Sequence, residues 1–177
     1  MKRGWRSVVA CVLASSVLVM GAPEAALADT AVFSDKKNDA ISRIDVRRVK
    51  VVNAKPVVVR MKFEDLRRTQ GSGVVVFFDT RGGDPGPEFA ATGGLGPIRD
   101  WQMLRVENWK SQSAQGIVRC DVDMRVRYGK DVARFDLARD CLKRPGRIRV
   151  AVHATGPKRG HDDWAPRFHR FYPWVPR

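Results

Sequence analysis

Residues 117–142 read IVRCDVDMRVRYGKDVARFDLARDCL, and this stretch decides the fold. Its first half alternates apolar and charged residues with a period of two, as a strand with one buried face does. Gly129-Lys130 marks a turn, and the second half returns with Phe135 and Leu137 on the apolar side. The stretch predicts an antiparallel β-hairpin.

Two cysteines, Cys120 and Cys141, lie at the open end of this hairpin and are predicted to form a disulfide. Two free thiols are the alternative, while a zinc site would lack a nearby histidine. A two-residue turn would place Cys120 opposite Arg139 and set Arg125 against Arg134, and like charges directly opposite are unfavourable. We therefore expect a longer or bulged turn that brings the two sulfurs together.

Several other stretches carry the strand pattern. They are Ile41–Val52, Pro56–Glu64, Gly73–Asp79, Trp101–Trp109 and Arg147–Ala154. The alternation in the first changes phase near Arg47-Arg48, which predicts a bulge there. Gly73–Asp79 is apolar on both faces, so we expect it to be a central strand. Seven or eight strands without a helical period predict an all-β chain, folded as a single antiparallel β-sandwich of immunoglobulin-like or jelly-roll-like type. A barrel is the alternative that alternation alone does not separate.

Two segments do not alternate. Residues 80–100 contain six glycines and three prolines, which is typical of a functional or mobile loop, with Glu88–Thr92 as a candidate short edge strand. The tail from Gly156 onward is rich in aromatic residues, proline and arginine, and we expect it to dock on the body of the domain.

The N-terminus has the pattern of a secretory signal. A positive start (residues 1–6) precedes an uncharged apolar stretch (residues 7–22), and Ala26-Leu27-Ala28 supplies a cleavage site before Asp29. The apolar stretch is short for a membrane span, which needs about 20 residues. We predict a signal helix within residues 1–28, cleavage between Ala28 and Asp29, and a secreted product. Residues 29–40 are then a flexible segment and residues 41–177 the sandwich with its tail.

The chain is strongly basic, with 33 Lys and Arg against 19 Asp and Glu, a net charge of +14. Removing the signal leaves a charge of about +12. Such a surface attracts anionic cell-wall polymer, acidic carbohydrate or phospholipid headgroups. The charge looks spread over all strands, and no nucleic-acid-binding module is recognisable, so we expect no nucleic-acid partner. Nothing indicates an oligomeric state.

Three further stretches carry a family resemblance. They are Phe78-Asp79-Thr80 with Gly86-Pro87-Glu88-Phe89, Asp140-Cys141-Leu142 with Pro145, and Asp163-Trp164-Ala165-Pro166 with Trp174-Val175. With them the chain resembles a group of small uncharacterised secreted proteins of actinobacteria over most of residues 40–177. The resemblance implies an exported β-sandwich and carries no catalytic residue. Those proteins often have aspartate where this chain has Arg81.

The candidate metal ligands are Asp79, Asp84 and Glu88 in the glycine-rich loop. Three carboxylates and loop carbonyls could supply the six to eight oxygens that Ca²⁺ takes. Against this, Arg81 lies within the loop, and the alternative is a solvated turn whose aspartates bond the local backbone. No other cofactor is predicted.

The candidate ligand-stacking residues are Trp101, Trp109, Trp164 and Trp174, which suit either a sugar-stacking platform or structural packing. No serine lies in a G-x-S-x-G nucleophile motif, and an oxidised cysteine pair has no nucleophile. We therefore predict a non-catalytic binding module at the cell envelope, with an extracellular hydrolase of polysaccharide or peptidoglycan as the alternative.

Overall fold

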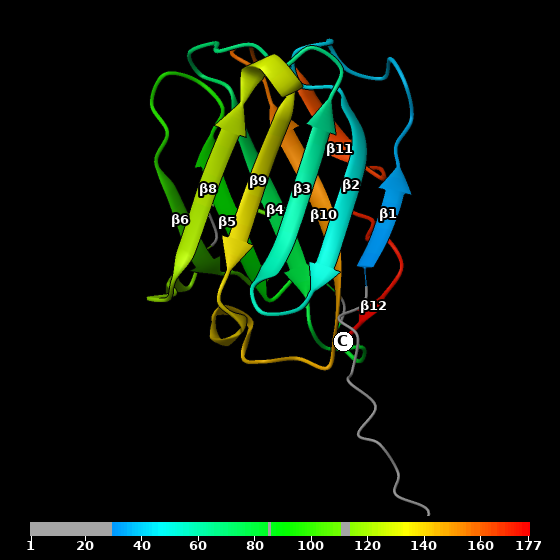
Figure 1. The fold of residues 1–177 in the computed structure, drawn as a ribbon, viewed down its shortest axis with the longest axis vertical. Coiled ribbons are helices and arrows are strands. Elements are labelled where there is room, and N and C mark those ends of the chain that lie inside the picture. The colour runs from blue at the N-terminus through cyan, green and yellow to red at the C-terminus, as the bar shows by residue number, and fades with distance from the viewer. Residues whose placement is uncertain (1–29, 85, 111–113) are drawn as a thin grey trace, which may run out of the picture.

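Two β-sheets lie face to face in the computed structural model, which describes residues 30–84, 86–110 and 114–177 (Figure 1). Sheet A has the order β1-β2-β3-β9-β8, formed by β1 (Thr30–Ser34), β2 (Val46–Asn53), β3 (Val57–Phe63), β9 (Val132–Leu137) and β8 (Val122–Arg127). Sheet B has the order β11-β10-β4-β5-β6-β7, formed by β11 (Asp162–Ala165), β10 (Arg147–Thr155), β4 (Gly73–Asp79), β5 (Phe89–Gly94), β6 (Trp101–Arg105) and β7 (Gly116–Ile117). A last strand, β12 (Val175–Pro176), pairs with β10. All the pairings are antiparallel, so the predicted all-β sandwich is confirmed.

The signal segment and the predicted cleavage position at Ala28 and Asp29 lie outside the described residues. In the part of the chain that the structure covers, no helix is long and apolar enough to cross a membrane.

Alternate residues of the strands form the core between the sheets. On β3, Val57, Val59, Met61 and Phe63 are fully buried, as the period of two predicts. Strand β4 lies between β10 and β5, which confirms the central position expected from its apolar sequence. The predicted bulge near Arg47-Arg48 is also confirmed, because the β2–β3 register shifts between Val46 and Arg48.

The described residues form twelve strands rather than seven or eight, because short edge strands carry too few residues to show a pattern. The expectation that residues 29–40 are flexible needs correction, since residues 30–34 form β1 at the edge of sheet A. Phe33 anchors this strand by stacking on Tyr172 at a ring-centroid distance of 4.6 Å. The stacking partner is remote in sequence, so local pattern could not reveal it.

The glycine-rich loop contains a strand that is not at an edge. Strand β5 lies between β4 and β6, whereas Glu88–Thr92 was expected to form an edge strand. Its small residues weaken the sequence signal for a strand. Small residues suit the interior position, because a Cβ atom at Gly93 would overlap the Met124 sulfur and the Met124 side chain would have to move.

The hairpin of β8 and β9 keeps the register that a two-residue turn would give. Arg125 lies opposite Arg134 and Asp123 opposite Asp136, so the expected change of register is wrong. The expected longer turn is present, because β8 ends at Arg127, β9 begins at Val132, and a turn of 3₁₀-helix, η2 (Tyr128–Lys130), lies between them. The like charges are tolerated because each strand forms its own ion pair two residues apart, between Arg125 and Asp123 (2.7 Å) and between Arg134 and Asp136.

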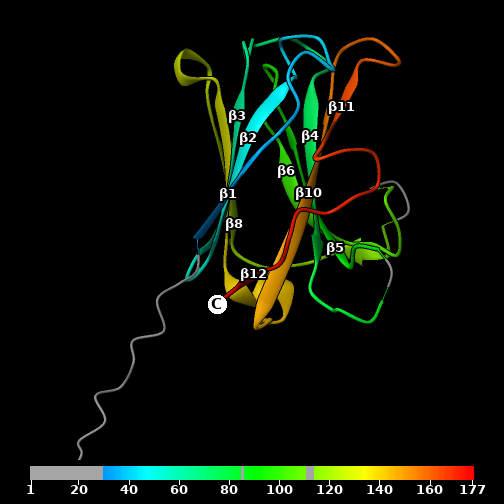
Figure 2. The ribbon, with the colours of Figure 1, turned by 90° about the vertical axis from the view of Figure 1, so that its right-hand side faces the viewer.

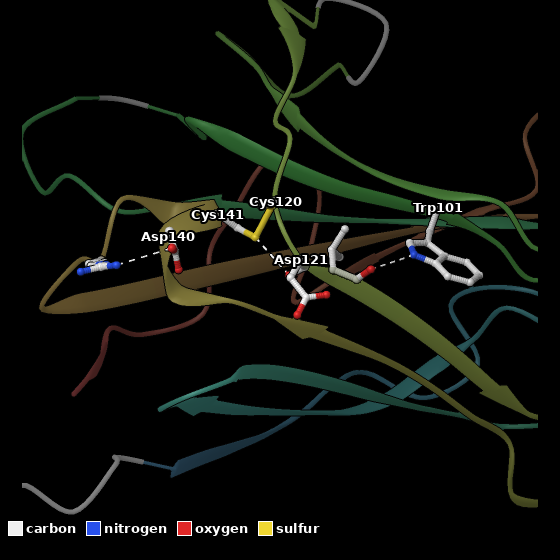
Figure 3. The surroundings of a disulfide bond; sticks show 7 residues. Trp101, Cys120, Asp121, Asp140 and Cys141 are labelled. Atoms are coloured by element: carbon white, nitrogen blue, oxygen red, sulfur yellow. Dashed lines mark hydrogen bonds and ion pairs between the residues drawn. A yellow bond between two sulfur atoms is a disulfide. The ribbon is translucent and has the colours of Figure 1, made fainter.

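The Cys120–Cys141 disulfide is present and closes the open end of this hairpin (Figure 3). A single turn of 3₁₀-helix, η3 (Arg139–Leu142), follows β9 and carries Cys141 back to Cys120. The turn after the strand therefore brings the sulfurs together, with no change in strand register.

The two outer faces of the sandwich differ. The C-terminal segment crosses the outer face of sheet B (Figure 2), where Trp109, Trp164 and Phe171 pack against a second apolar cluster around Phe77. The predicted docking of the aromatic tail is confirmed by these contacts. Sheet A has no such cover in the described chain, so the residues on its outer face point to solvent.

Candidate polyanion-binding face

The outer face of sheet A carries a continuous row of positive charges. Lys50 on β2 pairs with Arg60 on β3, Arg60 pairs with Arg134 on β9, and Arg134 pairs with Arg125 on β8. Directly opposite residues on adjacent strands have Cβ atoms about 5 Å apart. The row thus crosses four strands without an intervening neutral or acidic residue.

More positive charges flank this row. Arg48 on β2 lies opposite Lys62 on β3, and Arg127 ends β8 beside Lys130 in the turn. We call the whole set the cationic face: Arg48, Lys50, Arg60, Lys62, Arg125, Arg127, Lys130 and Arg134.

Only part of this charge is neutralised within the protein. Lys62 pairs with Asp131 at 2.9 Å, and Arg125 and Arg134 have the ion pairs described above. The remaining five cations make no ion pair with any described residue. They are Arg48, Lys50, Arg60, Arg127 and Lys130, all exposed.

A hollow of about 270 Å³ lies within the cationic face. Its lining consists of five cations and one valine: Arg60, Arg125, Arg127, Lys130, Arg134 and Val132. Like charges held side by side repel one another, at roughly 0.2–1 kcal/mol for a cross-strand pair. A bound anion would convert this repulsion into attraction, and a concave surface of one charge concentrates the electric field.

The prediction that the positive charge is spread over all strands needs correction in part, because sheet B carries Arg105, Arg147 and Arg149 while a larger set of cations gathers on one face of sheet A. Alternation places one side of β2, β3, β8 and β9 in the core, which sends their charged side chains to a single face. Strand pairing then aligns charges that are up to 84 residues apart, from Lys50 to Arg134. The sequence contains the alternation but not the strand order, so the row could not be predicted.

The four candidate stacking tryptophans do not form one platform. Trp109 and Trp164 are part of the cluster on sheet B, with ring centroids 6.0 Å apart. Trp101 is 40% exposed and its Nε1 donates to the Val122 carbonyl at 3.0 Å (Figure 3). Trp174 lies beneath the guanidinium of Arg147, 4.5 Å from the ring centroid. Each ring therefore has a structural contact, and sugar stacking stays a prediction.

The three candidate calcium ligands are engaged by protein donors. Asp79 is fully buried, and its Oδ2 accepts from Arg149 Nε at 2.6 Å. Glu88 Oε2 accepts from the Thr80 amide at 2.7 Å, and burial raises the pKa of the Glu88 carboxyl. Asp84 is exposed and pairs with Arg81 at 3.4 Å. Glu88 Oε1 is buried and makes no hydrogen bond to a described residue, so these contacts satisfy only part of the loop's carboxylate oxygens. Calcium binding at these residues stays a prediction.

Comparison of the chain with protein-family models, with curated proteins and with solved structures finds no match.

Proposed function

We propose that this chain is an exported, non-catalytic β-sandwich module that binds anionic polymers of the cell envelope through the cationic face. The row Lys50–Arg60–Arg134–Arg125 carries the proposal, because it sets cations side by side across four strands of an uncovered sheet. Its half on β9 and β8 is paired with aspartates, whereas Lys50 and Arg60 make no ion pair with a described residue. The disulfide supports a location of the protein in an oxidising compartment outside the cytoplasm.

The form of the surface favours a polymer over a small ligand. The cationic face is a broad sheet surface whose hollow of about 270 Å³ is lined almost wholly by charged side chains, whereas small-molecule sites are enclosed and mostly apolar. A second hollow of about 670 Å³ shares Arg125 and Arg134 with this face, and four aspartates also line it. A chain of phosphate or carboxylate groups could contact several of the unpaired cations at once. Binding of this kind adds many weak, solvent-exposed attractions, and salt weakens each of them.

The test compares two variants of equal net charge for retention on purified cell wall. The face variant replaces Arg48, Lys50, Arg60 and Arg127 with glutamine. All four are exposed and make no ion pair with a described residue, so their replacement leaves the fold intact. We expect roughly 10- to 100-fold weaker binding at low salt, since each cation near an anionic surface contributes up to about 1 kcal/mol. Wild-type binding should disappear at about 1 M salt, where the Debye length is about 3 Å.

The control variant removes four positive charges from loops away from the cationic face. It replaces Lys158, Arg159, Arg167 and Arg170 with glutamine, all of them exposed and located in the β10–β11 loop or the C-terminal segment. We expect it to bind within about threefold of wild type, because its cationic face is complete. Equal losses in the two variants would show that only net charge matters, and an absence of wild-type retention at low salt would refute the proposal.

A further inference from the structure

The connection between β1 and β2 meets β11 at a group of acidic side chains. Asp35 and Asp39 lie on the connection and Asp163 on β11, and one carboxylate oxygen of each lies within 4.8 Å of the others. We call these three residues the acidic cluster. In Figure 1 the connection runs over the top of the sandwich, at the end opposite the disulfide. The cluster thus joins an edge of sheet A to an edge of sheet B.

Polar atoms around the cluster are buried without a partner. Asp45 is 1% exposed, and its Oδ1 makes no hydrogen bond to any described residue, although its Oδ2 accepts from the Asn38 amide at 2.9 Å. Asp35 Oδ2 is likewise buried and unpartnered. A buried polar atom without a partner is costly and rare, so each such atom needs an explanation.

Tyr172 gives a second, independent indication. Its side chain is 4% exposed, and its hydroxyl approaches Asp35 without reaching hydrogen-bonding geometry. Burial, followed by the charges of Asp35 and Asp163, raises the pKa of this phenol. The Tyr172 hydroxyl is therefore buried close to the carboxylates and makes no hydrogen bond to a described residue. Its oxygen is available as a metal ligand.

The negative charges are poorly compensated. Burial, together with the charges of Asp35, Asp39 and Asp45, raises the pKa of Asp163 to about 7. The Val46 amide donates to Asp163 Oδ2 at 2.6 Å, which is a backbone contact and adds no positive charge. The one described cation in contact is Arg47, which pairs with Asp45 at 3.2 Å and with Glu64 at 3.1 Å. Acidic groups thus converge, without an adequate counter-charge, in a chain of net charge +14.

We propose that Asp35, Asp39 and Asp163 bind a calcium ion, with the unpartnered Asp45 Oδ1 and Tyr172 hydroxyl as further buried oxygens near the site. The donor set consists of oxygens alone, with no thiol or imidazole, and hard cations prefer such sites. Ca²⁺ takes six to eight oxygens at flexible geometry, which suits ligands from a loop and a strand. Bound there, the ion joins the β1–β2 connection to β11 and lies beside the C-terminal segment.

Thermal unfolding of the whole chain tests the proposal. After chelation, addition of excess calcium should raise the wild-type Tm by about 5–10 °C, because a ligand that binds only the folded state stabilises it. Potassium chloride at equal ionic strength should produce no comparable rise. An equal rise with potassium would show charge screening alone and would overturn the proposal. A rise with magnesium but none with calcium would overturn the assignment of calcium.

Two matched variants locate the ion. Asp39→Asn removes an exposed member of the cluster, so the chain should still fold. We expect its calcium-free Tm to equal or exceed that of wild type, because repulsion is relieved, and we expect its calcium response to be lost. Asp84→Asn removes one exposed carboxylate from the glycine-rich loop and should leave the response unchanged. A response that persists in Asp39→Asn, or disappears in Asp84→Asn, would refute the assignment to the acidic cluster.

Discussion

Replacing Asn53 with alanine is expected to destabilise the fold by about 3 kcal/mol. Asn53 is fully buried at the end of β2, where its Oδ1 accepts from Arg139 Nη1 at 2.6 Å. Its Nδ2 donates to the Val175 carbonyl at 3.0 Å. Arg139 is 4% exposed and pairs with no carboxylate of the described residues, so it depends on neutral oxygens, those of Asn53, Ala54 and Pro145. Alanine would remove the donor to the Val175 carbonyl and would leave Arg139 Nη1 with only its long contact to the Ala54 carbonyl, at 3.4 Å.

A double-mutant cycle with Arg139→Met tests whether the unpaired Arg139 guanidinium causes the loss of stability in Asn53→Ala. Methionine removes the buried charge and fills part of the same space, so Asn53→Ala should cost clearly less in that background. Chemical denaturation of the four proteins gives the free energies of unfolding. Equal costs in the two backgrounds would contradict the account, because the loss would then come from the cavity alone.

Removing the disulfide is expected to destabilise the fold about as much as Asn53→Ala does. Cys120 and Cys141 are 21 residues apart, and closing a loop of this size stabilises the folded state by about 3 kcal/mol. The Cys120→Ala/Cys141→Ala protein should therefore unfold roughly 10 °C below wild type. Thermal unfolding followed by circular dichroism measures the difference.

Reduced wild-type protein is the matched control, because it loses the cross-link and keeps both sulfurs. We expect its Tm to fall by nearly the same amount. If the double variant stayed within 1 °C of the oxidised protein, η3 would be held by packing alone, and the fully buried Leu142 would be the residue responsible.

Much of the fold could be predicted because many strands show a local alternation of apolar and polar residues. The period of two in β3, β8 and β9 located those strands, and the doubly apolar β4 was correctly expected at the centre of a sheet. Strand β5 was misplaced because its alanines and glycines give no alternation.

The sites could be predicted less well because they depend on long-range pairing. The disulfide was correctly expected from two cysteines near one hairpin, although η3 was not. The acidic cluster combines residues 35 and 39 with residue 163, and no local pattern connects them. The calcium prediction at Asp79 instead followed acidic residues close together in sequence, and the structure pairs that carboxylate with Arg149.

The cationic row has a consequence for ligand choice. Neighbouring strands lie about 4.8 Å apart, and hydrogen bonds fix that interval. The Cα atoms of the row are therefore nearly evenly spaced from strand to strand. A disordered basic tail adapts to any arrangement of anions. This sheet instead favours polymers whose charges recur at a matching repeat, so two polyanions of equal charge and different repeat length should differ in affinity.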